Sequence, residues 1–110
     1  MRILLDECVH AGVRAAFPSH SVSTVSEAGW RGTKDDSLLR LAERGGDVFL
    51  TIDRRIEQQI DLRAFALGFV IVRVASNTLA AYLPSFEQLL RAVESVRKGE
   101  VIHLDARPSR

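Results

Sequence analysis

The chain has 110 residues, the size of one domain, which leaves no room for a second. Its hydrophobic fraction of 46% and charged fraction of 26% are ordinary for a globular protein and exclude an intrinsically disordered chain. Fifteen Lys and Arg residues against fourteen Asp and Glu residues give a net charge of +1. Overall charge therefore does not indicate a nucleic-acid or membrane partner, and any charge signal must be local.

Cysteine content and apolar runs indicate a cytoplasmic protein. The single cysteine, Cys8, cannot form an intramolecular disulfide, which favours a reducing compartment. The N-terminal apolar segment is too short for a signal peptide. The clearest apolar run, residues 64–72, is about half as long as a membrane span, so we expect no membrane partner.

Short apolar runs predict five β-strands. Uninterrupted runs are typical of strands buried on both faces of a sheet, whereas residues 21–25 alternate polar and β-branched side chains, as an edge strand does. In chain order, the predicted strands are residues 3–5, 21–25, 48–52, 69–74 and 100–104.

Helical spacing of apolar side chains predicts four helices between these strands. Capping-box patterns place the start of the second helix at Thr33 and that of the fourth at Ser85, and glycines follow both helices. The third has only Ile56 and Ile60 as an apolar seam, so we expect it to be short and exposed. In chain order, the predicted helices are residues 9–17, 34–44, 54–63 and 85–97.

The alternation of strands and helices predicts an α/β fold of three layers. Such alternation is typical of a five-stranded, mainly parallel sheet with helices on both faces. The usual doubly wound strand order, 2-1-3-4-5, brings the first and third strands together, and ligands bind at the carboxyl ends of strands at that switch point. We expect one domain over residues 1–105 and a C-terminal tail over residues 106–110.

Carboxylates gather where predicted strands end. Asp6 and Glu7 follow the first strand, Asp53 follows the third, and Asp35 lies at the start of the second helix. Each alone is explained by helix capping or by the helix dipole. Together they predict a site for Mg²⁺ or Mn²⁺, which prefers carboxylate oxygens and relieves their repulsion. Such an ion can activate water and stabilise phosphoryl charge, as in metal-dependent nucleases.

Three stretches of the chain carry a resemblance to a known family. They are residues 3–7 (ILLDE), 29–42 (GWRGTKDDSLLRLA) and 48–53 (VFLTID). They resemble the short PIN-like domains, compact relatives of PIN-domain ribonucleases that are commonly found as toxins of bacterial toxin-antitoxin pairs. The later strands and the last helix also fit, so the resemblance covers nearly the whole chain.

The resemblance implies a Mg²⁺- or Mn²⁺-dependent endoribonuclease that hydrolyses RNA phosphodiester bonds. Asp6, Asp35 and Asp53 match the family's catalytic, metal-binding aspartates, and Glu7 matches the second acid of its Asp-Glu-Asn opening. Cys8 stands at the Asn position, and the short chain lacks a glutamate that larger PIN enzymes carry in an extra helical region. Both departures bear on whether the metal site is complete. The resemblance also implies a cognate antitoxin as partner and allows a homodimer.

Basic residues near the acids predict contacts with RNA phosphates. Arg31 and Lys34 precede the second helix, and Arg54 and Arg55 follow Asp53. Phosphate contacts supply affinity without sequence preference. Solvated arginines that balance nearby acids would give the same pattern.

The loop over residues 26–34 carries Trp30 between two glycines. A tryptophan in such a loop either covers the core, stacks on a base or forms part of a partner interface. We take this loop as the expected rim of an antitoxin interface.

Two other functions remain open from the sequence. A PIN-like binding module would keep the acids without catalysing a reaction. A receiver-like phosphoacceptor would use Asp6, Glu7 and Asp53, but the fourth strand ends without Ser or Thr and the fifth has no lysine to hold a phosphoryl group.

Overall fold

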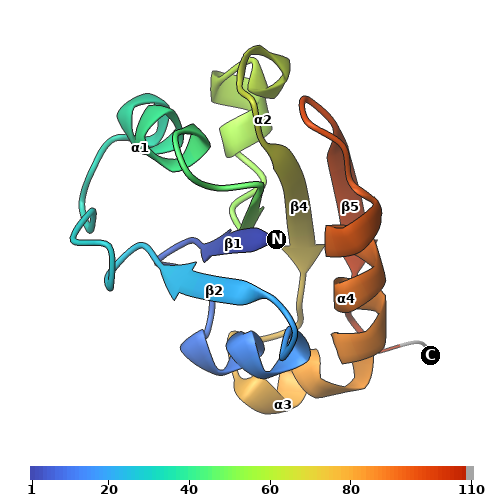
Figure 1. Cartoon of the computed structure of the whole chain (residues 1–110). Coiled ribbons are helices and arrows are strands. Elements are labelled where there is room, and N and C mark those ends of the chain that lie inside the picture. The colour runs from blue at the N-terminus through green and yellow to red at the C-terminus, as the bar shows by residue number, and fades with distance from the viewer. Residues whose placement is uncertain (109–110) are drawn as a thin grey trace.

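The computed structural model describes residues 1–108 (Figure 1). Within them, a five-stranded sheet has the strand order β2-β1-β3-β4-β5, and all neighbouring strands are parallel. The strands are β1 (Arg2–Leu5), β2 (Ser21–Thr24), β3 (Val48–Thr51), β4 (Gly68–Arg73) and β5 (Val101–Asp105). The predicted fold class and strand order are therefore confirmed, and the sheet is parallel throughout.

The helices between the strands are short. They are η1 (Ala11–Ala16), α1 (Asp35–Glu43), α2 (Ile56–Gln59), η2 (Leu62–Ala64), α3 (Leu79–Tyr82), η3 (Leu83–Ser85) and α4 (Phe86–Ser95), where η marks a 3₁₀ helix. In Figure 1, α1 and α2 lie together, away from α3 and α4. No helix within residues 1–108 is long and apolar enough to cross a membrane.

The first helix differs from the prediction because it has 3₁₀ geometry. Its hydrogen bonds join residues three apart, as from the Val13 N–H to the His10 carbonyl at 3.1 Å. Its two buried side chains, Val13 and Ala16, are also three residues apart, which is the repeat of a 3₁₀ helix. The sequence spacing of four, from Val9 to Val13 to Phe17, suggested an α-helix instead.

The segment over residues 54–63 is two short helices, α2 and η2, rather than one. Ile60 has extended backbone geometry and separates them, and the Asp61 side chain accepts a hydrogen bond from the Arg63 N–H at 3.2 Å. The sequence analysis missed α3, whose Tyr82 is fully buried in the core. Its four residues are too few to give a helical repeat in the sequence.

Both predicted capping boxes are wrong. The N-cap of α1 is Lys34 rather than Thr33, and no side chain caps this helix end. Ser85 precedes α4 but belongs to η3 and makes no capping hydrogen bond. The chain enters α4 from another helical turn, so the N–H groups that a cap would serve already face helical carbonyls.

Side chains that alternate along the strands divide between two apolar clusters. The cluster shared with η1, α3 and α4 contains, among others, Leu5, Leu50, Val70, Val72, Val13, Tyr82, Leu89 and Val93. The cluster shared with α1 and α2 contains, among others, Leu4, Phe49, Phe69, Ile71, Leu38, Leu39 and Ile56. Because successive strand residues point to opposite faces of a sheet, this division is consistent with three layers.

The chain after β5 begins with a residue of the core. Ala106 is buried, and its N–H donates to the Arg73 carbonyl at 2.8 Å. The strand itself continues to Asp105, one residue past its predicted end. Of the predicted tail over 106–110, residues 109 and 110 lie outside the described part of the chain.

Candidate active site

Asp6 is the most buried carboxylate in the described chain, with 9% of its surface exposed. It follows β1 directly. Its Oδ1 accepts a hydrogen bond from the Glu7 N–H at 2.8 Å, and its Oδ2 accepts one from the Thr51 hydroxyl at 2.7 Å. Because an unpartnered polar group is costly to bury, these two donors hold the carboxylate in one orientation.

Thr51 joins the ends of β1 and β3. The residue is fully buried at the end of β3. Its hydroxyl donates to Asp6 and accepts a hydrogen bond from the Asp53 N–H at 3.0 Å. The sequence analysis used Thr51 only as part of a matched stretch and missed this role. The available signal was a hydroxyl group at the end of an otherwise apolar strand.

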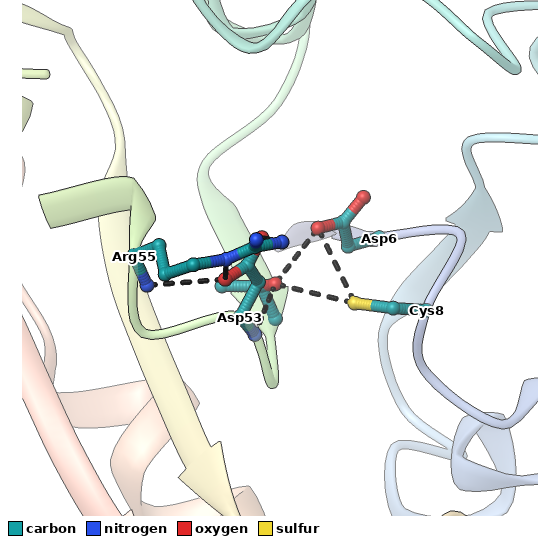
Figure 2. A network of polar contacts seen from close by, with 5 residues as sticks. Asp6, Cys8, Asp53 and Arg55 are labelled. Carbon is teal, nitrogen blue, oxygen red and sulfur yellow. Dashed lines mark hydrogen bonds and ion pairs between the residues drawn. The ribbon is translucent and has the colours of Figure 1, made fainter. Parts of the chain in front are cut away.

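Asp53 lies two residues past β3, and Arg55 binds both of its carboxylate oxygens. The Arg55 Nε donates to Oδ1 at 3.0 Å and Nη2 donates to Oδ2 at 3.2 Å, as Figure 2 shows, while the Arg55 N–H also donates to Oδ1. The Arg55 guanidinium thereby holds the pKa of the Asp53 carboxyl below its usual value. Asp53 thus carries a negative charge that the chain already neutralises.

Asp35 is the first residue of α1 and is half-buried. Burial is the largest cause of a raised pKa at Asp35, and the negative charges of Asp6 and Asp53 raise it further. Charges act on one another in this way only over short distances. Asp35, at the start of α1, is thus influenced by the charges of Asp6 and Asp53, while Thr51 joins Asp6 and Asp53 directly at the carboxyl ends of β1 and β3.

The remaining predicted residues surround these aspartates. The exposed Glu7 lies 3.8 Å from the Arg31 guanidinium, between Oε2 and Nε. Lys34 and Asp35 line a shallow pocket of about 470 Å³ between the start of α1 and the end of α2. Arg54 is exposed beside Arg55 and faces another pocket, on the β4 and β5 side.

Cys8 stays close to Asp6. Its thiol lies 3.5 Å from the Asp6 Oδ2 and 3.5 Å from the Thr51 hydroxyl, and Figure 2 shows it pointing toward Asp6. Burial raises the pKa of the Cys8 thiol, so the group is neutral near pH 7. As a weak donor, it contacts the carboxylate at the position where the resembled family has an asparagine.

The sequence analysis also missed Asn77, which anchors the loop after β1. Its Nδ2 donates to the Cys8 carbonyl at 2.8 Å, and its Oδ1 accepts from the His10 N–H at 3.2 Å. The hydroxyl of the buried Tyr82 donates to the same oxygen. Nothing in the local sequence indicates that Asn77 reaches a loop almost seventy residues earlier in the chain.

Trp30 is half-buried and packs against the apolar cluster that the sheet shares with α1 and α2. It also lines a pocket of about 330 Å³ between β1, β2 and α1. The tryptophan therefore covers core, one of its expected roles. It lies at the margin of that cluster, with part of its surface open to a partner.

The carboxylates fit a hard cation by their chemistry but do not form a closed site. Among residues 1–108, no group of three or more His, Cys, Asp or Glu side chains is arranged to hold a metal ion. Arg55 already binds both carboxylate oxygens of Asp53. Mg²⁺ needs only one or two protein carboxylates when water and substrate phosphate complete its shell, and Asp6 and Asp35 supply that number.

Comparison with known protein families, curated proteins and solved structures found no match for this chain. The resemblance to short PIN-like domains stays a prediction from three sequence stretches.

Proposed function

We propose that this protein is a Mg²⁺- or Mn²⁺-dependent endoribonuclease and the toxin of a toxin-antitoxin pair. One observation carries the proposed nuclease activity: the Thr51 hydroxyl donates to the Asp6 carboxylate and accepts from the Asp53 backbone N–H, which joins the ends of two neighbouring strands, and the charges of both aspartates act on Asp35. The carboxyl end of β1 and β3 is the switch point of the strand order, where α/β sheets bind ligands. The toxin role rests on the resemblance alone.

The proposed chemistry assigns a role to each side chain. A divalent cation held by Asp6 and Asp35, and by Asp53 where the ion displaces Arg55, would supply an activated water and stabilise charge on the phosphoryl oxygens. Thr51 orients Asp6 through its 2.7 Å hydrogen bond, so the carboxylate is positioned before any ligand arrives. Arg55 neutralises Asp53 in the absence of metal and would have to release it for Asp53 to bind the ion.

The test is cleavage of single-stranded RNA by the purified protein with Mg²⁺ or Mn²⁺, with EDTA as the metal-free control. We expect cleavage that EDTA abolishes and that Asp53→Asn reduces by about a hundredfold or more. Asp61→Asn is the matched control, because Asp61 and Arg63 form a similar exposed pair that is not joined to the Thr51 network. Equal activity of the two variants would contradict the proposal.

A binding module without catalysis is the second candidate, and one observation favours it. Arg55 already occupies Asp53, and the described residues contain no closed three-ligand group. This candidate predicts that the folded protein binds RNA and leaves it intact with either metal. The receiver-like alternative gains no support, because β4 ends at Arg73 and β5 carries no lysine.

A further inference from the structure

We propose that Arg54 and Arg73 form a binding site for a backbone phosphate of single-stranded RNA, next to the carboxylates. The choice of RNA as ligand rests on the proposed function above. The site itself rests on the strand register, on a pocket and on the pairing of the surrounding charges. Arg73 was not among the predicted RNA-binding residues.

The strand register places Arg73 beside the aspartates. Thr51, which joins Asp6 to Asp53, pairs with Ile71 of the neighbouring strand β4. Arg73 lies two residues past Ile71, as Asp53 lies two residues past Thr51. Because the strands are parallel, both charged residues leave the sheet at the same edge.

A pocket of about 200 Å³ lies at this edge, large enough for a phosphodiester group and bound water. Its lining residues come from the segment after β3 and from β4 and β5. They are Arg54, Ile71, Arg73, His103, Leu104 and Asp105. Two guanidinium-bearing residues therefore border one small space.

Neither of these arginines is already paired. Both are exposed, and neither makes an ion pair within residues 1–108. By contrast, Arg31 lies against Glu7 and Arg55 is bound to Asp53. Of the cations around the carboxylates, Arg54 and Arg73 are thus free to meet a phosphate, which a guanidinium binds through two parallel N–H groups.

Asp105 is the acid in the pocket lining, and it already has another partner, as does Glu57, which binds the lining residue His103. Arg107 donates to both carboxylate oxygens of Asp105, at 2.9 Å from Nε and 2.7 Å from Nη2. Arg73 is the cross-strand neighbour of Asp105 in the β4–β5 register, but no ion pair joins the two side chains. Glu57, on α2, is bound by the His103 ring. The pocket therefore keeps a net positive charge that favours an anion.

The site has a functional consequence for the orientation of the RNA. A strand with one phosphate on Arg54 and Arg73 runs across the ends of β3, β4 and β5. If the strand continues across β3 toward β1, its neighbouring phosphate lies on the side of Asp53 and Asp6. The pocket therefore holds a flanking phosphate, and the carboxylates face the bond to be cut.

The experiment measures binding of a fluorescein-labelled single-stranded RNA in EDTA, so that no metal-dependent cleavage interferes, over a range of salt concentrations. We expect Arg54→Gln and Arg73→Gln each to raise Kd about fivefold, the effect of losing one exposed charge contact. Each should lower the slope of log K against log salt by about 0.7, as loss of one phosphate contact on a single strand does. Arg73→Lys should keep the slope, because it keeps the charge.

Arg97→Gln is the matched control. Arg97 is exposed, makes no ion pair within residues 1–108 and lies just before β5, at the opposite edge of the sheet. Arg97→Gln changes the net charge of the protein by the same amount as Arg54→Gln and Arg73→Gln do. We expect its Kd and salt slope to stay near those of the wild type.

The outcomes separate this site from the nuclease proposal. Equal weakening by all three Gln variants, or no RNA binding by the wild type, would overturn the phosphate site. Selective weakening by Arg54→Gln and Arg73→Gln supports it, even if added Mg²⁺ or Mn²⁺ produces no cleavage and the nuclease proposal fails. Cleavage with an unchanged KM in Arg73→Gln would overturn the site while leaving the nuclease proposal standing.

Discussion

Arg55 holds both carboxylate oxygens of Asp53, at 3.0 Å through Nε and 3.2 Å through Nη2. The pair is local, since the residues are two apart in the chain, and the Arg55 side chain is 78% exposed. Exposed ion pairs contribute at most about 1 kcal/mol to stability. The arginine can therefore neutralise Asp53 when no metal is bound and move into solvent when one binds.

Replacing Arg55 should strengthen metal binding. Arg55→Gln removes the cation that competes for Asp53, so we expect Mn²⁺ to bind up to about fivefold more tightly, as the free energy of an exposed pair allows. Isothermal titration calorimetry measures the change. Arg63→Gln, which disrupts the similar pair with Asp61, is the control and should leave Mn²⁺ affinity unchanged. Unchanged affinity in Arg55→Gln would show that Arg55 does not compete with the metal.

Asp35 should make stability depend on pH in a defined direction. The pKa of Asp35 is higher in the folded protein than in the unfolded chain. Above the folded-state pKa the charged carboxylate therefore destabilises the fold, and below the unfolded-state pKa the group is protonated in both states and this destabilisation is absent. Asp35→Asn should therefore raise the melting temperature at pH 7, and this gain should shrink as the pH falls through the range where Asp35 is protonated. Melting curves of both proteins from pH 7 to pH 3 test this.

The same variant should respond less to divalent ions. Millimolar Mg²⁺ or Mn²⁺ should raise the melting temperature of the wild type by binding to the folded state, and Asp35→Asn should show a smaller rise. Asp36→Asn, the next residue in α1, is the matched control. A wild-type melting curve that ignores both ions would count against a metal site.

Thr51→Val should destabilise the fold although it keeps the shape of the side chain. It removes a donor to Asp6 and an acceptor for the Asp53 N–H, both near the buried end of β3. We expect a loss of about 1–3 kcal/mol in the free energy of unfolding, measured in urea. Thr33→Val should cost less than about 0.5 kcal/mol, because Thr33 caps no helix. Equal losses would show that the Thr51 bridge contributes nothing.

Trp30 should matter both to the fold and to the proposed antitoxin. Because Trp30 packs against the apolar cluster that the sheet shares with α1 and α2, Trp30→Ala should cost about 2 kcal/mol, less than truncation of a fully buried aromatic. Trp30→Phe should keep most of that packing. Co-expression with the product of the neighbouring gene tests the interface, and we expect a complex with the wild type that Trp30→Ala weakens.

The control for this experiment is the stability of each variant at the temperature of co-expression. A complex that survives Trp30→Ala undiminished would exclude the loop over residues 26–34 from the interface. No complex with the wild type would remove the antitoxin proposal.

The sequence by itself was enough to predict the class of fold and the strand order. Buried strands such as residues 48–52 have an apolar pattern that needs no knowledge of distant residues, and right-handed crossovers then restrict the order. The same patterns placed Asp6 and Asp53 at strand ends. The short helices were harder to predict, because α3 has too few residues to produce a repeat, and η1 was predicted as an α-helix from a spacing of four although its buried residues, Val13 and Ala16, are three apart.

Only the tertiary structure decided which polar side chains meet. Thr51 lies forty-five residues from Asp6, and Asn77 lies sixty-nine residues from Cys8. Arg73 reaches the edge beside Asp53 because Thr51 pairs with Ile71. Local patterns report whether a residue is buried and how its segment repeats, whereas these contacts depend on the register between strands and on the path of the loops. A shift of one residue in that register would turn Arg73 to the other face of the sheet.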